Sequence, residues 1–344
     1  MTDIRNCSLE ELEQLFKDWK ASLYHAQQVF SWIYQKEATS FDQMTNLSLD
    51  LRKRCKDKFV FQELELIKMQ ESTDGTKKFL FGLEDNNLIE SVLIPAEGRN
   101  TACLSTQVGC KYGCRFCASG LLGFKRNLAV WEILTQLLEI NRAKRGGSGK
   151  VSHVVFMGTG EPLDNYENVL KAIRIINSEE GLNIGARRIT ISTAGVIPGI
   201  ERLANEGLQI ELSVSLHSAC DKTRNQLMPI NRKYPLKELI SACRKYALAT
   251  GRQVTFEYVL IKDINCLSQD AKNLAKLLKG WLSKVNLLIY NPIEDFSFKS
   301  TDKSEALAFK QILQNEGIPV TLRKPRGQDI EGACGQLRLR RGPI

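Results

Sequence analysis

The sequence predicts an α/β protein in which six strand–helix units form a partial barrel, preceded by a small helical N-terminal domain. Two observations support this fold class. From about residue 100 onward, short β-branched apolar runs alternate with stretches of helical periodicity, a pattern typical of parallel strands with helices outside them. Before residue 75, apolar residues instead recur at intervals of three and four. Because eight units close a full barrel, six predict an open one.

The N-terminal 75 residues are predicted to form the helical accessory domain, with a contact to nucleic acid. Apolar residues mark two helical stretches: Leu9, Leu12, Leu15, Phe16 and Trp19, then Val29, Phe30, Ile33 and Tyr34. The segment Thr73–Thr76 (TDGT) predicts a turn between two short strands. Residues 76–100 are therefore predicted to complete a hairpin and to connect this domain to the barrel.

Residues 101–344 form the predicted barrel. Its strands are predicted at 101–108, 151–158, 187–195, 209–217, 253–261 and 284–290, with a further strand at 319–323. Helical patterns such as 128–144 and 268–280 lie between the strands. Ligands of such folds bind at the C-terminal ends of the strands, so functional residues are expected there.

The composition indicates a folded cytoplasmic protein with a polyanionic partner. Of the 344 residues, 43 % are hydrophobic and 25 % are charged, which is enough apolar content for a large core. The polar start lacks the apolar region of a signal peptide, and no stretch approaches the roughly 20 apolar residues of a membrane span. The net charge is +9, with basic runs at 52–58 and 323–341. These runs are candidate nucleic-acid contacts, although a solvated basic face explains the first run equally well.

The strongest chemical signal is a set of three cysteines, Cys110, Cys114 and Cys117, in the pattern Cys-x3-Cys-x2-Cys. Thiolates at this spacing select zinc or an iron–sulfur cluster. A structural zinc site has four ligands, usually in two pairs, and no second pair or histidine lies nearby. Three cysteines on a four-iron cluster leave one iron open for another ligand. A zinc-dependent RNA-binding module is the alternative from a different class of protein.

This spacing, with Phe116 before the third cysteine, resembles the radical-SAM superfamily, as does the segment Met157–Pro162 (MGTGEP). The resemblance implies a [4Fe-4S] cluster on the three cysteines and S-adenosylmethionine (SAM) bound at its open iron. Glycine backbone in the segment lets a ligand approach closely. The expected SAM contacts follow predicted strands: Gly160, Glu161, Ser192, Ser215, Leu216, His217 and Asn291.

Further motifs resemble the RlmN/Cfr family of radical-SAM RNA adenine methyltransferases over nearly the whole chain. They are residues 90–95 (ESVLIP), Cys103, residues 123–128 (GFKRNL) and residues 333–337 (ACGQL). The resemblance implies a partial (βα)6 radical-SAM barrel with an accessory domain, and methylation at C2 of an adenosine in the peptidyl-transferase region of 23S rRNA. Some members also modify the adenosine 3′ of the tRNA anticodon. The implied electron donor is a flavodoxin system, and a monomer is expected because the site needs no second subunit.

The resemblance assigns catalytic roles to Cys334, Glu90 and Cys103. C2 and C8 of adenine are too weakly nucleophilic to attack the methyl group of SAM directly. The family's solution is that one SAM methylates Cys334, and a second yields the radical that activates this methyl group for addition to adenine. Glu90 is the implied proton acceptor, and Cys103 the thiol that releases the product through a transient disulfide with Cys334. Apolar neighbours such as Leu88 and Val92 predict an apolar pocket around Glu90, which favours a base that works near neutral pH.

Methylation at C8 is the alternative within the family. Pro162 and the segment Phe124–Leu128 resemble the C2 branch, whereas the C8 branch has Gly-Glu-Ala and lacks the phenylalanine. Thr159 departs from the methionine usual in the family. A radical-SAM enzyme for a small molecule or peptide is a further alternative, since it would not need Cys103 and Cys334 together.

Overall fold

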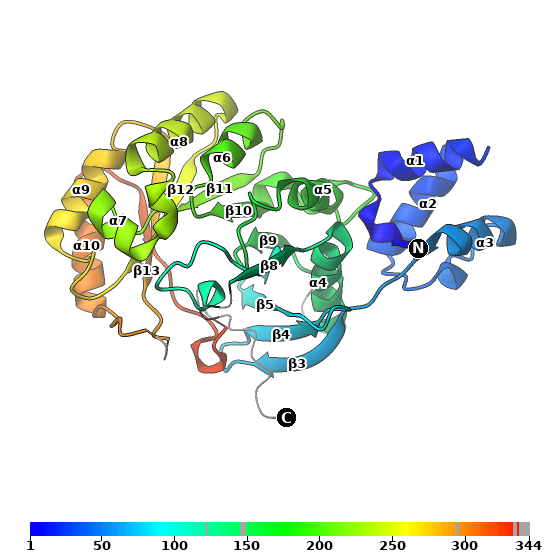
Figure 1. The fold of residues 1–344 in the computed structure, drawn as a ribbon, viewed down its shortest axis with the longest axis horizontal. Helices are drawn as coiled ribbons and strands as arrows, with labels where there is room; N and C mark the ends of the chain where they lie inside the picture. Colours follow the sequence, from blue (N-terminus) through cyan, green and yellow to red (C-terminus); the bar gives the residue numbers. More distant parts are fainter. Residues whose placement is uncertain (122, 145–148, 294–295, 333–335, 337–344) are drawn as a thin grey trace.

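The computed structural model describes residues 1–121, 123–144, 149–293, 296–332 and 336. At its centre these residues form a ten-stranded sheet in the order β14-β13-β12-β11-β10-β9-β6-β5-β4-β3 (Figure 1). The strands of this sheet are β3 (Glu65–Glu71), β4 (Lys77–Gly82), β5 (Leu88–Ala96), β6 (Arg99–Cys103), β9 (His153–Phe156), β10 (Ile189–Thr193), β11 (Glu211–Ser215), β12 (Val254–Leu260), β13 (Ser283–Ile289) and β14 (Val320–Leu322).

The strands β6 and β9 to β14 pair in parallel, and helices alternate with them. The helices are α4 (Val130–Ala143), α5 (Tyr166–Asn177), α6 (Ile197–Leu203), α7 (Asp221–Leu227), α8 (Leu236–Thr250), α9 (Ser268–Leu278) and α10 (Lys303–Asn315). Figure 1 shows α6 to α10 on the outside of the curved sheet. The predicted partial barrel of six strand–helix units, with a further strand, is confirmed. Across the described ranges, no helix is both long and apolar enough to cross a membrane.

The prediction of a single strand over residues 101–108 is wrong, because the chain leaves the sheet after Cys103. Residues Gln107–Gly109 form β7, which pairs antiparallel with β8 (Phe124–Asn127) in a separate hairpin. The backbone N–H groups of Thr106 and Gln107 both donate to the carbonyl of Thr159, at 2.9 and 3.2 Å. These two N–H groups therefore bond to the turn after β9, and they do not continue the pairing of β6 with a neighbouring strand.

The accessory domain contains α1 (Leu9–Asp18), α2 (Leu23–Tyr34) and α3 (Leu49–Lys58), which lie to one side of the barrel (Figure 1). Ser8 begins α1 with a capping box: its Oγ accepts from Glu11 N–H at 3.2 Å, and its N–H donates to the Glu11 carboxylate at 2.7 Å. The helical part is shorter than the predicted 75 residues, because Glu65–Glu71 form β3 and pair with β4 across the sequence-predicted turn.

The segment 76–100 does not stand apart as a connection. Its strands β4 and β5 continue the barrel sheet, with β5 antiparallel to β6. This arrangement pairs the backbone groups of β6 that would otherwise be exposed at the sheet edge, and it places Glu90 on the same sheet as Cys103. Short elements complete the fold: β1 (Thr2–Asp3) paired with β2 (Phe59–Val60), and the 3-10 helices η1 (Ile4–Asn6), η2 (Phe41–Gln43), η3 (Ala118–Gly120), η4 (Ala186–Arg188), η5 (Pro229–Arg232) and η6 (Gln328–Ile330).

Candidate active site

The three predicted cluster cysteines lie in the loop between β7 and β8. Cys110, Cys114 and Cys117 all line one pocket of about 180 Å³. Burial raises the pKa of the Cys110 thiol to about 12, with neighbouring acidic groups adding to the effect. Metal ligation by thiolates must therefore displace protons, and it becomes easier as the pH rises.

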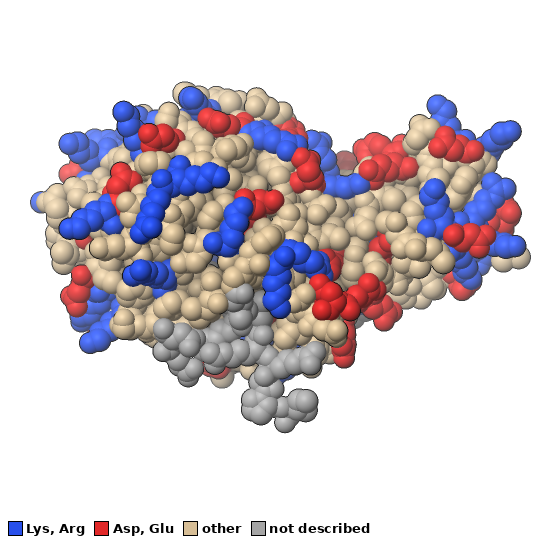
Figure 2. Space-filling model, viewed as in Figure 1, with Lys and Arg blue, Asp and Glu red and all other residues tan. Residues whose placement is uncertain are grey.

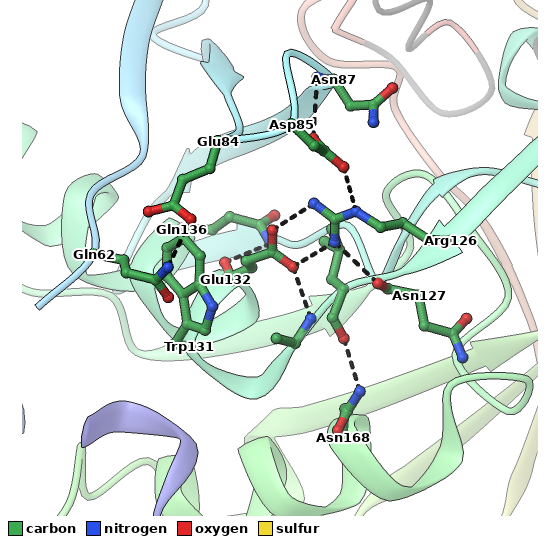
Figure 3. Close-up of polar contacts among 12 residues, drawn as sticks. Gln62, Glu84, Asp85, Asn87, Arg126, Asn127, Trp131, Glu132, Gln136 and Asn168 are labelled. Atoms are coloured by element: carbon green, nitrogen blue, oxygen red, sulfur yellow. Dashed lines mark hydrogen bonds and ion pairs between the residues drawn. The ribbon is translucent and has the colours of Figure 1, made fainter. Parts of the chain in front are cut away.

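An ion-pair network holds β8, the strand that follows the cysteine loop (Figure 3). The Arg126 guanidinium of β8 binds both carboxylate oxygens of Glu132, at 2.8 and 2.7 Å, and its Nε donates to Asp85 at 2.6 Å. Glu132 lies in the first turn of α4 and is 3 % exposed, and Asp85 lies in the turn between β4 and β5. Arg126 thus joins β8 to the barrel and to the β4–β5 hairpin.

The opposite wall of the pocket is the glycine-rich turn after β9. A Cβ atom on Gly158 would lie 2.7 Å from the backbone of Leu104 and Ser105. Gly160 has a φ of +110°, and a Cβ atom there would lie 2.6 Å from the side chain of Gln107. Only glycine permits the turn to pack this closely against residues 104–107.

Glu161 is buried in this wall, at the pocket. Burial raises its pKa to about 7, although backbone N–H groups oppose the shift. These donors are Ala194 N–H to Oε2 at 2.7 Å and Leu163 N–H to Oε1 at 3.1 Å. Both carboxylate oxygens therefore already accept one hydrogen bond from the protein, and the predicted contact with SAM stays a prediction.

The other predicted SAM contacts lie at or just after the C-terminal ends of the strands, and all but Leu216 line the pocket. Ser192 of β10, Ser215 of β11, His217 and Asn291 line the same pocket as the cysteines. Leu216 does not line it: the strand alternates, so this side chain is fully buried in the core. The predicted contact of Leu216 with SAM stays a prediction.

His217 is a neutral imidazole. Its Nδ1 accepts from the N–H of Val259 at 3.0 Å, which leaves the ring proton on Nε2. Burial lowers the pKa of His217 to about 3, and the nearby charge of Arg224 adds to this. The ring also packs edge-on against Phe116, with 4.5 Å between ring centroids. It can therefore serve as a fixed donor and as packing, without gaining a charge near neutral pH.

Arg224 of α7 supports the pocket and was missed by the sequence analysis. Its side chain is fully buried, and burial lowers its pKa to about 10. The guanidinium donates to the carbonyls of Ala194 (2.8 Å), Ser215 (3.1 Å) and Leu216 (3.0 Å), and to Asn231 Oδ1 (2.6 Å). It ties together the ends of β10 and β11. An arginine in a short polar helix gives no signal of such partners in the sequence.

A second cavity, of about 370 Å³, adjoins the first and contains Cys103. The two cavities share five wall residues: Met157, Leu288, Ile289, Asn291 and Arg323. Val92 and Ile94 of β5 also line the second cavity, together with four basic residues, namely Arg99, Arg323, Lys324 and Arg326.

Glu90 lies on β5 next to this cavity, and its surroundings differ from the expected apolar pocket. Glu90 is 3 % exposed, but Lys78 Nζ lies 3.4 Å from its Oε1. The predicted apolar pocket did not take account of the pairing of β4 with β5, which places Lys78 on the same face of the sheet as Glu90. The carbonyl of Glu90 accepts from Ser105 Oγ at 2.6 Å, and Ser105 Oγ accepts from Thr159 N–H at 2.9 Å. Glu90 is thereby linked to the glycine-rich turn of the first cavity.

Cys334 lies outside the described residues, so its predicted role stays a prediction. The same holds for the basic residues 338–341. The chain before Cys334 is clamped by the β3–β4 turn: Ser72 Oγ donates to Asp329 at 2.6 Å, and Gly327 N–H donates to Asp74 at 3.1 Å. Gly332 lines the second cavity.

The donor chemistry of the first cavity fits the predicted cluster. Three soft thiol ligands and a close-packed glycine turn surround a cavity with space for a group larger than one ion. In the ranges that the structure describes, no three His, Cys, Asp or Glu side chains are gathered around a single ion position. Cys110, Cys114 and Cys117 are thus the residues that would hold a cluster.

Fold and site together define an enzyme of the radical-SAM class. The family model described as "Radical SAM superfamily" matches residues 104–276, and that described as "Ribosomal RNA large subunit methyltransferase N-terminal domain" matches residues 2–60. The solved structure of a radical SAM methyltransferase from Sphaerobacter thermophilus is 43 % identical and has a TM-score of 0.94, covering 99 % of this chain and 100 % of that one.

Two curated relatives identify the family. The probable dual-specificity RNA methyltransferase RlmN of Dictyoglomus turgidum is 46 % identical over 98 % of this chain and 97 % of its own length. The dual-specificity RNA methyltransferase RlmN of Pelobacter propionicus is 44 % identical over 98 % and 96 %. The chain therefore belongs to the RlmN family of radical-SAM RNA methyltransferases. The predicted family, enzyme class and cofactors, a [4Fe-4S] cluster and SAM, are confirmed.

Proposed function

We propose that this chain methylates C2 of an adenosine in the peptidyl-transferase region of 23S rRNA, and of the adenosine 3′ of the tRNA anticodon. The observation that carries the proposal is the contact between two cavities, one lined by three cysteines and the other by Cys103. Because the two cavities share five lining residues, a radical formed in the first would arise next to a base held in the second. The names of the relatives, dual-specificity RNA methyltransferases, support two RNA substrates.

In the proposed mechanism the protein residues act at defined atoms. When bound, the cluster and SAM supply a methyl group and a carbon-centred radical. The sulfur of Cys334 holds the methyl group, which gives one hydrogen atom to this radical, and the carbon then becomes bonded to adenine C2. The Glu90 carboxylate accepts a proton from this adduct, and the adduct also gives up one electron, for which the oxidised cluster would be the acceptor. The Cys103 sulfur then attacks the Cys334 sulfur to form a disulfide; the electron pair of the broken C–S bond stays with the carbon, which takes up a proton to become the product methyl group.

The basic wall of the second cavity is the proposed RNA contact. Arg99, Arg323, Lys324 and Arg326 present positive charge at the cavity that would receive the base, and such groups bind phosphates. The face drawn in Figure 2 carries Lys and Arg side chains over both the barrel and the accessory domain, with Asp and Glu side chains among them. The run at 52–58 is partly engaged within its own domain, since Arg54 pairs with Asp50 at 2.9 Å and Lys56 with Asp42 at 2.6 Å. A monomer with a flavodoxin-type electron donor completes the proposal.

Nucleoside analysis by mass spectrometry tests this function. Anaerobically reconstituted protein is given SAM, a reductant and either unmodified 23S rRNA or unmodified tRNA. We expect 2-methyladenosine from both RNAs. A peak of 8-methyladenosine would overturn the position of methylation, and no methylated adenosine while SAM is still cleaved would overturn RNA as the substrate.

A Cys103→Ala variant tests the release step separately. It should cleave SAM but retain the RNA on the protein, as a covalent adduct on a denaturing gel that nuclease digestion shortens. Cys243→Ala is the matched control, because Cys243 is a buried core thiol of α8. Full methylation by Cys103→Ala would exclude a role for the Cys103 thiol in release.

A further inference from the structure

Glu90 and Cys103 share one face of the sheet with a lysine. Lys78 of β4 and Cys103 of β6 are both direct cross-strand partners of Val92 on β5, so these three side chains leave the same face. Glu90 lies two residues before Val92 and therefore points the same way. Cys103 itself packs with the apolar side chains of Val92, Ile94, Val155 and Met157, while Arg99 and Thr101 line the same cavity farther along β6.

Lys78 is a buried cation on this face. Its side chain is 8 % exposed, and that of Glu90 is 4 % exposed. Lys78 Nζ lies 3.4 Å from Glu90 Oε1 and also donates to the carbonyl of Glu331 at 3.5 Å. Removing two charges from water is costly, and an apolar pair of similar size often serves stability equally well. Fold stability is therefore a weak reason for an ion pair at this position.

We propose that Lys78 is a positioning residue that keeps Glu90 an oriented carboxylate, ready to accept the proton of the RNA adduct. The inference rests on the proposed function, in which Glu90 is the proton acceptor. An isolated carboxyl group among apolar side chains keeps its own proton, whereas an adjacent ammonium group favours the carboxylate. In the step, a C–H bond of the adduct breaks, the proton forms an O–H bond with Glu90, and the electron pair stays with the adduct. Lys78 takes no part in the bonds that break and form.

Other charged and titratable groups reach this region from the neighbouring elements. Among the described residues, Cys103 of β6 and the basic residues Arg99, Arg323, Lys324 and Arg326 lie in the cavity wall, and Glu331 after η6 accepts from Lys78 through its backbone carbonyl. Two of these cations have acidic partners of their own: Arg323 lies 3.5 Å from Glu257, and Arg326 lies 3.9 Å from Asp74. Lys78 lies within ion-pair distance of Glu90, so its removal should change the ionisation of this carboxyl group directly.

The test compares Lys78→Met with Lys78→Arg, which keeps the charge, and with Lys77→Met as the matched control. Lys77 is the preceding residue of β4, points to the opposite face and pairs with Glu71 at 3.1 Å. Each cluster-loaded protein is assayed with 23S rRNA between pH 6 and 9. The readouts are 2-methyladenosine, 5′-deoxyadenosine and the covalent protein–RNA adduct.

We expect Lys78→Met to form 5′-deoxyadenosine normally, to accumulate the adduct and to lose at least about tenfold in methylation at pH 7. The acidic limb of its pH–rate profile should move upward by about 1 to 3 pH units, the effect of an opposite charge at this distance. Lys78→Arg should restore the profile, and Lys77→Met should match the unsubstituted chain.

An acidic limb that stays in place in Lys78→Met, or a loss that Lys78→Arg does not restore, would overturn the inference while leaving the proposed function intact. If Lys78→Met fails to retain iron, Lys78→Gln replaces it in the same comparison, and an unmoved limb again overturns the role. No methylated adenosine from the unsubstituted chain would instead overturn the proposed function, and the role of Lys78 with it.

Discussion

Replacing Arg224 by leucine should destabilise the protein far more than the loss of an exposed arginine. The substitution removes four hydrogen bonds and leaves three backbone carbonyls and the Asn231 amide oxygen without this donor in a buried region. At roughly 1 kcal/mol for each hydrogen bond, the free energy of unfolding should fall by about 4 kcal/mol. That is a large part of the 5 to 15 kcal/mol that is typical of folded proteins.

Urea unfolding, followed anaerobically by far-ultraviolet circular dichroism, measures this change. With a denaturant slope of about 3 kcal/mol/M or somewhat more, the midpoint should fall by about 1 M. Arg174→Leu is the matched control, because Arg174 is 54 % exposed and its pair with Glu206 should contribute at most about 1 kcal/mol. Equal midpoints for the two variants would refute the argument that Arg224 braces the buried carbonyls. Since these carbonyls lie at the ends of β10 and β11, SAM binding should weaken as well.

Four further predictions concern the cysteine loop, its anchor, the C-terminal clamp and RNA. Cys114→Ala should hold only a small fraction of the normal iron after anaerobic reconstitution, and normal iron content would contradict the assigned ligands. Arg126→Leu, which loses the bonds to Glu132 and Asp85, should release iron to a chelator faster than the unsubstituted chain; an equal rate would exclude an anchoring role. Although burial raises the pKa of Asp74, hydrogen bonds including one from Gly327 outweigh it and lower it to about 2. The stability that Asp74 contributes should therefore be complete above about pH 4 and disappear as the pH falls through 2; the difference in unfolding free energy from Asp74→Asn should follow this course, and a constant difference would contradict it. If the four basic residues of the second cavity each neutralise one phosphate, RNA affinity should fall about a hundredfold between 50 and 200 mM salt, and an insensitive affinity would exclude them.

The barrel could be predicted because its information is local. The central parallel strands are largely buried, β12 at every position, and show as β-branched runs, and polar residues follow several of their C-terminal ends. The three cysteines are eight residues from first to last, so their shared pocket also follows from the sequence.

What could not be predicted depends on register and distant partners. Lys77 and Lys78 are chemically identical neighbours, and only the pairing of β4 with β5 decides which one faces Glu90. Arg224 binds backbone carbonyls up to 30 residues away, and backbone groups leave no mark in a sequence. The burial of the Leu216 side chain could likewise not be predicted, because Leu216 lies between two residues that line the pocket, Ser215 and His217.

The clamp between the β3–β4 turn and the segment after β14 has a consequence for biosynthesis. Ser72 and Asp329 are 257 residues apart in the sequence, yet they form a direct hydrogen bond. Contacts of such long range form only after both partners have left the ribosome. The β3–β4 turn therefore lacks these hydrogen bonds until the residues after β14 have been synthesised. The three cysteines leave the ribosome long before Arg323, which lines both cavities, so the ligands of the cluster are available before either cavity can be complete.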